Sequence, residues 1–384
     1  LGQTIASSGV VIAMNPQTGE ILAMVSWPTY DNNRFARVID YDYYVEQAND
    51  PWFPMLNHAV QILYPPGSVF KIVTAAGVLE ENIIDPQREL FDPGKIVIRD
   101  AYFPADLGRA REFVCWKPDG HGLQNFVQAI TNSCNVYFYK VGGGYEEDGV
   151  GGLGIDLLGK WLRLFGFGQT TGVELPGELA GFIPSPDWKR ITWGESWSTG
   201  DTYNAVIGQG YVAVTPLQML NAYNAIANGG RLLQPTLINK ILDGEGQVVS
   251  DPQPVVLSQV PIQPENLALI QTGLRDVVTV GTLAGDPGAF GEHDRLIINV
   301  PGVNVAGKTG TAEYCDELAY ERGLCIFGRW PKHAWTAAYA PFEDPEISVI
   351  AFVYNGLEGS QMAGPIAGDV LRAYFEYKAI DAGL

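Results

Sequence analysis

The sequence predicts an α/β fold of the α+β kind, in which a central antiparallel β-sheet is packed between helices. Two observations support this. The 384 residues are 46% hydrophobic and 17% charged, which is the composition of an ordinary globular protein that can bury a large core. Strand-type and helix-type segments alternate along the chain, and the sequence contains no internal repeat or low-complexity tract.

The elements are predicted in order from hydrophobic periodicity and turn residues. Two apolar strands, Gly9–Met14 and 21–25, flank a turn with Pro16 and Gly19 and indicate a buried hairpin. A buried helix runs from Ser68 to Leu79. Further helices are predicted at 124–131, 136–141, 153–165, 216–228, 265–279 and 366–377. Further strands are predicted at 305–312, 334–340 and 347–354, with a second hairpin at 237–249 and an ordered loop at 175–202.

The charge balance excludes some partners. Acidic residues outnumber basic ones 43 to 24, and a net charge of −19 repels nucleic acid and anionic lipid. The sequence has no apolar run of about 18 residues and no signal peptide at its start. Because a strand pattern begins as early as Val10, we expect that a membrane anchor or an upstream domain precedes this chain.

The first chemical motif is Ser68-Val69-Phe70-Lys71 at the start of the buried helix. A spacing of three residues places the hydroxyl and the amine on one helix face. Desolvation in a buried helix would lower the pKa of the lysine from about 10.4, so that it could activate the serine as a nucleophile. The helix N-terminus offers N–H groups to an oxyanion. Taken alone, the motif is equally compatible with an ordinary surface pair.

The second motif, Ser133-Cys134-Asn135, lies in a break between two apolar helices, where two polar side chains could point to the same place. The alternative is a simple helix cap, because Ser and Asn are favoured there. The third motif is Lys308-Thr309-Gly310-Thr311 at the end of a strand. Its glycine would allow a substrate to pair its main chain with this strand. The alternative is a β-turn with a solvated lysine.

Together, the three motifs form one known catalytic set. Their order and separations, with the flanks Tyr64-Pro65-Pro66-Gly67 and Ala306-Gly307, resemble the penicillin-binding protein family. The segments 200–204, 207–211 and 215–218 resemble its elongation-type class B members, which are monofunctional transpeptidases. The similarity runs from about residue 9 to residue 377. We expect the three additional segments to shape the core beside the site.

The resemblance implies a penicilloyl-serine transferase (β-lactamase-like) fold. The whole chain, 1–384, would be a transpeptidase domain with an α/β subdomain at about 1–65 and 231–384 and a mainly helical subdomain at about 66–230. A membrane anchor and a pedestal domain would lie outside this chain. The protein would then work outside the cytoplasm, in the periplasm or on the outer face of the membrane. It would act with a membrane-embedded glycan polymerase and the elongation complex.

The resemblance also implies a role for each motif residue. Ser68 would attack the D-alanyl-D-alanine carbonyl of a peptidoglycan stem peptide, with Lys71 as its base and no cofactor. Ser133 would relay a proton to the leaving nitrogen, and Asn135 would hold the substrate amide and position Lys71.

The strand motif would bind the substrate carboxylate, which β-lactams imitate, through Lys308, Thr309 and Thr311, with Gly310 leaving room for the ligand backbone. The N–H groups of Ser68 and Thr311 would form the oxyanion hole. Two other classes of function share these motifs. One is a hydrolase, either a D,D-carboxypeptidase or a β-lactamase. The other is a penicillin-sensing receptor domain, against which the Gly208-Gln209-Gly210 segment argues.

The four cysteines fall into two pairs. Cys315 and Cys325 bracket a short polar segment after the third motif and predict a disulfide-closed hairpin. Cys115 and Cys134, with His121 between them and Asp100 before them, have the chemistry of a tetrahedral zinc site. Some elongation-type relatives carry structural zinc beside the second motif. A Cys115–Cys134 disulfide and buried free thiols are the alternatives. We expect His58 and His333 to be ordinary packing or surface residues.

Overall fold

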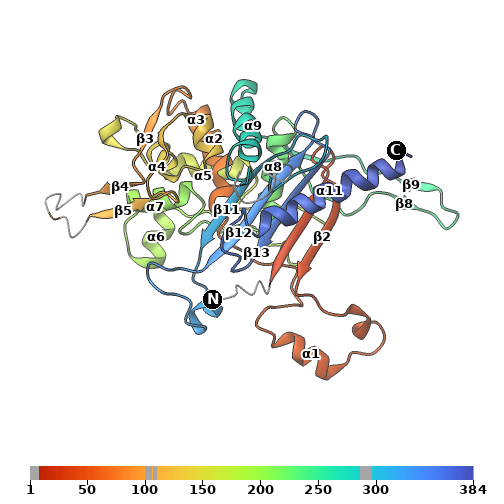
Figure 1. Cartoon of the computed structure of the whole chain (residues 1–384). Coiled ribbons are helices and arrows are strands. Elements are labelled where there is room, and N and C mark those ends of the chain that lie inside the picture. The colour runs from red at the N-terminus through yellow and green to blue at the C-terminus, as the bar shows by residue number, and fades with distance from the viewer. Residues whose placement is uncertain (1–7, 100–105, 107–109, 286–295, 384) are drawn as a thin grey trace.

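The structure, a computed structural model, describes residues 8–99, 106, 110–285 and 296–383. Within these ranges, the main sheet has five strands in the order β11-β12-β13-β1-β2, and all neighbouring pairs are antiparallel. The strands are β1 (Gly9–Met14), β2 (Ile21–Trp27), β11 (Ala306–Glu313), β12 (Lys332–Ala340) and β13 (Ile347–Val353). The predicted α+β fold with a central antiparallel sheet is confirmed (Figure 1).

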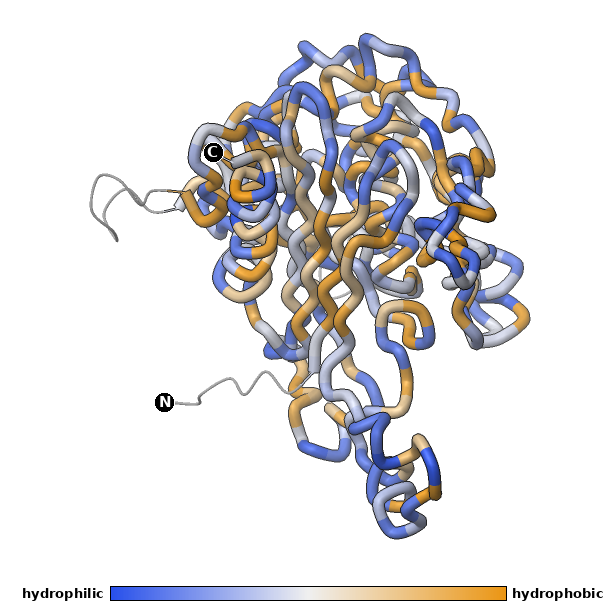
Figure 2. The backbone as a smooth tube through the Cα atoms, turned by 90° about the vertical axis from the view of Figure 1, so that its right-hand side faces the viewer, coloured by the Kyte–Doolittle hydropathy of each residue, from blue (hydrophilic) through white to orange (hydrophobic). Residues whose placement is uncertain are grey.

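Helices cover both faces of this sheet. The long helix α11 (Ala363–Asp381) lies across one face, and α8 (Pro216–Ala227) packs against β12, β13 and β1 from the other (Figure 1). All seven residues of β13 are therefore buried. Hydrophobic residues follow the strands through the middle of the molecule (Figure 2). Strand β11 lies at the sheet edge, so one side of its backbone has no strand partner in the sheet, and it packs against α9 (Pro264–Thr279).

The second half of the molecule consists mainly of helices around α2 (Lys71–Glu80), in which nine of the ten residues are buried. Helix α2 packs against α4, α5 and α9, which confirms the predicted buried helix. The other helices of this half are α3 (Phe126–Thr131), α4 (Asn135–Gly143), α5 (Gly154–Leu164), α6 (Pro186–Trp193) and α7 (Thr199–Val206). The subdomain boundaries near residues 65 and 231 stay a prediction.

Four short two-stranded sheets complete the described β-structure. Their strand pairs are β3 (Leu90–Asp92) with β6 (Gly122–Gln124), β4 (Lys95–Ile98) with β5 (Arg111–Val114), β7 (Arg231–Leu233) with β10 (Val256–Gln259), and β8 (Ile241–Leu242) with β9 (Val248–Ser250). The last pair is the hairpin predicted at 237–249, and it projects from the molecule (Figure 1).

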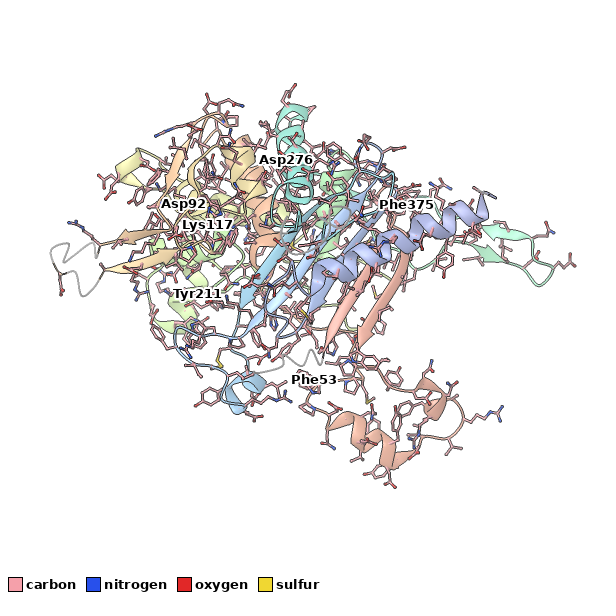
Figure 3. The ribbon with its side chains drawn as sticks, viewed as in Figure 1. Phe53, Asp92, Lys117, Tyr211, Asp276 and Phe375 are labelled. Atoms are coloured by element: carbon pink, nitrogen blue, oxygen red, sulfur yellow. A yellow bond between two sulfur atoms is a disulfide. The ribbon has the colours of Figure 1, made fainter. Side chains whose placement is uncertain are left out.

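The prediction of a loop at 175–202 is wrong in part, because α6 and the start of α7 lie there. The Ser185 side chain caps α6, which has proline in its first turn, and Ser198 forms a capping box with Asp201 at the start of α7. The sequence analysis predicted a loop because the segment is rich in Gly and Trp, and it overlooked these two capping serines. The sequence analysis also missed α1 (Tyr41–Ala48), on the projecting arm that precedes Phe53 (Figure 3), and the five-residue α10 (Glu317–Glu321). Among the described helices, none combines the length and the apolar character needed to span a membrane.

Candidate active site

Ser68 lies on a tight turn immediately before helix α2. The prediction began the α-helix at this serine, but residues Gly67–Phe70 form a 3-10 turn, and α2 starts at Lys71. Gly67 has a φ of 58°, which tightens the entry into the helix. Ser68 is half-buried, and within the described part of the chain its hydroxyl makes no hydrogen bond, so the group is not committed to a structural partner.

Lys71 is buried and points its amine at the second motif. Its Nζ donates to Asn135 Oδ1 at 2.7 Å, to the Ser133 carbonyl oxygen at 2.7 Å and to Ser133 Oγ at 3.3 Å. Burial lowers the pKa of Lys71 to about 8, and nearby thiol and carboxyl groups limit this decrease. A lysine with such a pKa can accept a proton near neutral pH, as a base for Ser68 requires.

The break between α3 and α4 presents the second motif to this lysine. Ser133 adopts a left-handed conformation with a φ of 52°. Cys134 is the N-cap of α4, and its sulfur accepts a hydrogen bond from the Tyr137 N–H at 3.4 Å. The alternative of a cap formed by Ser133 or Asn135 is therefore wrong. Because the sulfur satisfies the helix end, the Ser133 and Asn135 side chains are both available to Lys71.

The third motif forms half of strand β11, and its lysine is not solvated. Lys308 is fully buried, and its Nζ donates to the Thr309 carbonyl oxygen at 3.1 Å. Burial and the nearby charge of Lys71 lower the pKa of Lys308 well below its usual value. The alternative of an exposed turn is therefore wrong.

Close backbone contacts hold the Ser68 turn against β11. A Cβ added to Gly67 would lie 2.5 Å from the Thr311 carbonyl oxygen, and one added to Gly310 would lie 3.1 Å from the Pro66 carbonyl oxygen. On its other side, the Gly67 N–H donates to the Gly208 carbonyl oxygen at 2.8 Å. The segment 207–211 thus supports the nucleophile turn, as the sequence analysis expected. All three motifs come together at this point.

Two residues that the sequence analysis missed contact the hydroxyls of the third motif. Thr282, just after α9, has its Oγ1 2.7 Å from Thr309 Oγ1. Glu358, in the turn after β13, accepts a hydrogen bond from Thr311 Oγ1 to its Oε2 at 2.8 Å. Neither residue carries a local sequence signal, because each reaches β11 only through the folding of a distant segment.

The four residues Asp92, Cys115, His121 and Cys134 form a buried cluster behind the second motif, and their ligand atoms all lie within 4.8 Å of one another. Asp92 Oδ2 lies 2.7 Å from His121 Nδ1 and 3.2 Å from Cys134 Sγ, and Cys115 Sγ lies 3.4 Å from the same nitrogen. Asp100 lies outside the described residues, and the carboxylate of the cluster is Asp92, which sits in the interior of the helical half (Figure 3).

The donor set of this cluster fits a zinc ion. Two sulfurs, one imidazole nitrogen and one carboxylate oxygen are a chemically suitable tetrahedral set. The Cys134 hydrogen bond lowers the pKa of Cys115 to about 5, which favours the thiolate that a metal requires. Cys115 and Cys134 are free thiols, so the alternative of a disulfide between them is wrong. The predicted Cys315–Cys325 disulfide is confirmed.

The two remaining histidines are buried packing residues rather than surface ones. His58 Nδ1 lies 3.1 Å from both Ser8 Oγ and Tyr64 OH. His333 stacks on Tyr314 with ring centroids 3.6 Å apart.

Fold and motifs together are those of the penicilloyl-serine transferase fold. The model of the penicillin binding protein transpeptidase domain matches residues 9–372, and the chain belongs to this family. A curated relative, the peptidoglycan D,D-transpeptidase MrdA of Haemophilus influenzae, is 34% identical over 374 residues, covering 96% of this chain and 53% of the relative. The chain thus spans about half the length of that relative. The similarity to elongation-type class B members is confirmed.

Two solved structures are similar over nearly the whole chain. Pseudomonas aeruginosa PBP2 in complex with WCK 5153 has a TM-score of 0.76 and 31% identity, covering 96% of this chain and 74% of that one. A chain of a peptidoglycan synthase complex that coordinates polymerization and crosslinking has a TM-score of 0.76 and 33% identity, covering 96% of this chain and 56% of that one.

Proposed function

We propose that this chain is the catalytic domain of a peptidoglycan D,D-transpeptidase, which cross-links stem peptides through a serine acyl-enzyme and is a target of β-lactams. One observation carries the proposal. Lys71 Nζ lies 2.7 Å from both Asn135 Oδ1 and the Ser133 carbonyl oxygen, while the Ser68 turn rests on β11. The residues to which we assign the roles of nucleophile, base, proton relay and substrate strand therefore lie together, which supports the proposal.

The proposed reaction begins when neutral Lys71 takes the proton of Ser68 Oγ, which forms a bond to the penultimate D-alanine carbonyl carbon. The bond from this carbon to the terminal D-alanine nitrogen breaks, and that nitrogen receives a proton through Ser133. An acceptor amine then attacks the ester carbon, and its proton returns to the serine oxygen through Lys71. The N–H groups of Ser68 and Thr311 would stabilise each oxyanion. No step requires a cofactor.

The third motif would bind the donor. Lys308, Thr309 and Thr311 would attract the terminal carboxylate of the stem peptide, which β-lactams also carry. Gly310 lets β11 lie close to the Ser68 turn, because a side chain at this position would meet Val69 and Pro66 at contact distance. The ligand would pair with the edge strand β11 beside this turn.

We further propose that Asp92, Cys115, His121 and Cys134 hold a structural zinc ion. Such an ion would cross-link the segments that carry its ligands without taking part in acyl transfer. Cys134 lies between Ser133 and Asn135, so fixing its sulfur fixes the two residues that contact Lys71. The complete protein would be anchored to the membrane, act outside the cytoplasm and join a glycan polymerase in an elongation complex. The similar chain from a peptidoglycan synthase complex supports the polymerase partner.

The test is incubation with a fluorescent penicillin followed by mass spectrometry of the labelled peptide. We expect a long-lived adduct on Ser68 that is absent from Ser68→Ala. The matched control is Ser250→Ala, which alters a serine of the distant β8–β9 hairpin and should keep the adduct. Rapid loss of the adduct would instead favour a hydrolase. Absence of any adduct on the folded protein would refute the proposal.

A further inference from the structure

The carboxylate of Glu358 stands beside the strand that would bind the donor carboxylate. Its Oε2 accepts the hydrogen bond of Thr311 Oγ1 at 2.8 Å. The same threonine hydroxyl accepts a long hydrogen bond from the Gly359 N–H, at 3.5 Å. The hydroxyl that the proposed function assigns to an anionic ligand is therefore already donated to an anion of the protein.

The turn that carries Glu358 is held firmly in place. A Cβ on Gly359 would lie 2.3 Å from the Trp335 carbonyl oxygen and 2.5 Å from the Gly310 carbonyl oxygen, so the turn packs backbone against backbone. Thr336 Oγ1 donates to the Gly359 carbonyl oxygen at 3.1 Å. This oxygen also accepts a backbone N–H at 2.8 Å where α11 begins. The position of Glu358 is thus fixed relative to β11.

One exposed ion pair partly offsets the charge of this carboxylate. Lys332 Nζ lies 3.6 Å from Glu358 Oε1, but both side chains are partly exposed, at 37% and 46%, so solvent screens the pair. Lys308 is buried, and its pKa is lowered well below its usual value by burial and by the charge of Lys71. A ligand anion at Thr311 would meet the negative charge of Glu358 at short range, although the same solvent reduces its effect.

We propose that Glu358 is a specificity-determining residue whose negative charge disfavours ligands with an anionic group at Thr311. The inference rests on the proposed function, in which Thr311 faces the ligand carboxylate. It predicts that the site reacts more slowly with an anionic β-lactam than the same site would without the charge of Glu358.

The test compares Ser68 acylation rate constants for benzylpenicillin, an anion, and for its neutral methyl ester. Glu358→Gln keeps an oxygen that can accept the Thr311 hydrogen bond and removes the charge. We expect the rate with the anion to rise roughly three- to tenfold and the rate with the ester to change less than about twofold. Glu358→Asp keeps the charge, so its ratio of anion to ester rates should stay near that of the wild type.

The matched control is Asp369→Asn, which removes an exposed negative charge that pairs with Arg372 on α11. It should leave the ratio unchanged, because the effect is local rather than a consequence of net charge. The inference would be overturned if Glu358→Gln had an unaltered melting temperature and still formed the Ser68 adduct, but showed an unchanged or lower ratio of anion to ester rates. Failure of both ligands to acylate wild-type Ser68 would overturn the proposed function itself.

Discussion

The chemistry of the proposed reaction depends on the protonation state of one residue, Lys71. Its amine is fully buried, yet it keeps three oxygen partners, two from Ser133 and one from Asn135. Burial disfavours the charged amine, while the oxygen acceptors preserve its position. The consequence is a base that is held in place and is partly neutral near physiological pH.

This pKa sets the expected pH dependence of acylation. The pKa of Lys71 is lowered to about 8 by burial, and only the unprotonated amine can accept the Ser68 proton. The neutral fraction therefore increases with pH, from roughly one-tenth at pH 7 to roughly nine-tenths at pH 9. We expect the acylation rate constant for penicillin to rise about tenfold over this range, as stopped-flow measurements would show.

A profile that is flat from pH 7 to 9, or that rises only around pH 10.5, would mean that Lys71 is not the base or that its amine is solvated. The buried Lys140 offers a control, because its Nζ is bound to Phe91 O and Asp148 in the helical half, away from the three motifs. Lys140→Met should leave the shape of the profile unchanged.

At the scale of secondary-structure elements, the cluster of two thiols, an imidazole and a carboxylate joins the strand pairs β3–β6 and β4–β5 to helix α4. Asp92 ends β3, Cys115 follows β5, His121 precedes β6, and Cys134 caps α4. These elements are short, so a central cross-link is an effective way to fix their arrangement. The cross-link would also hold the second motif in place, because Cys134 is its middle residue.

The zinc proposal leads to a measurement on protein purified without chelator. We expect about one zinc per chain by elemental analysis, and near-complete loss of zinc in His121→Ala. The buried His58, which is outside the cluster, provides the matched control, and His58→Ala should retain the metal. His121→Ala should also melt at a lower temperature, because the cross-link is lost. Metal-free wild-type protein with normal folding would rule out the zinc site.

At the scale of the whole molecule, the active site lies where the helical half meets the sheet. The Ser68 turn leads into α2 in one half, and β11 is the edge strand of the other. The contact between them is made by backbone, since a Cβ on Gly67 would come within 2.5 Å of the Thr311 carbonyl oxygen. The fit of the two halves therefore depends on the absence of side chains at Gly67 and, on the β11 side, at Gly310.

Gly67→Ala tests this contact. The added Cβ must displace the turn from β11, so we expect the free energy of unfolding to fall by roughly 2–4 kcal/mol and acylation to slow by at least about tenfold. Gly149→Ala is the control, because Gly149 also has a positive φ, 63°, but nothing within 4 Å of the added Cβ. It should cost of order 1 kcal/mol and leave acylation unchanged.

Urea denaturation and penicillin acylation measure both effects. Equal losses of stability in the two variants would show that the backbone conformation, and not the contact with β11, is the important property of Gly67. If Gly67→Ala is destabilised but is acylated at the normal rate, the contact between Gly67 and β11 is needed for stability and not for acylation.

The sequence predicted those parts of the fold and site that depend on local patterns. Alternating apolar residues predicted the strands β1, β12 and β13, and a nearly uniform apolar run predicted α2. It missed α6 and α7, where glycine and tryptophan conceal the helical period.

The sequence by itself determined which chemical groups are present, in the order serine, lysine, serine, asparagine, lysine and threonine, because short motifs carry that information in their spacing. Only the tertiary structure decided which carboxylates stand beside them. Asp92 joins the cysteine cluster and Glu358 reaches Thr311 across 47 positions of the chain. Such contacts leave no local pattern, since chain segments meet through packing of their backbones and not through the spacing of their residues.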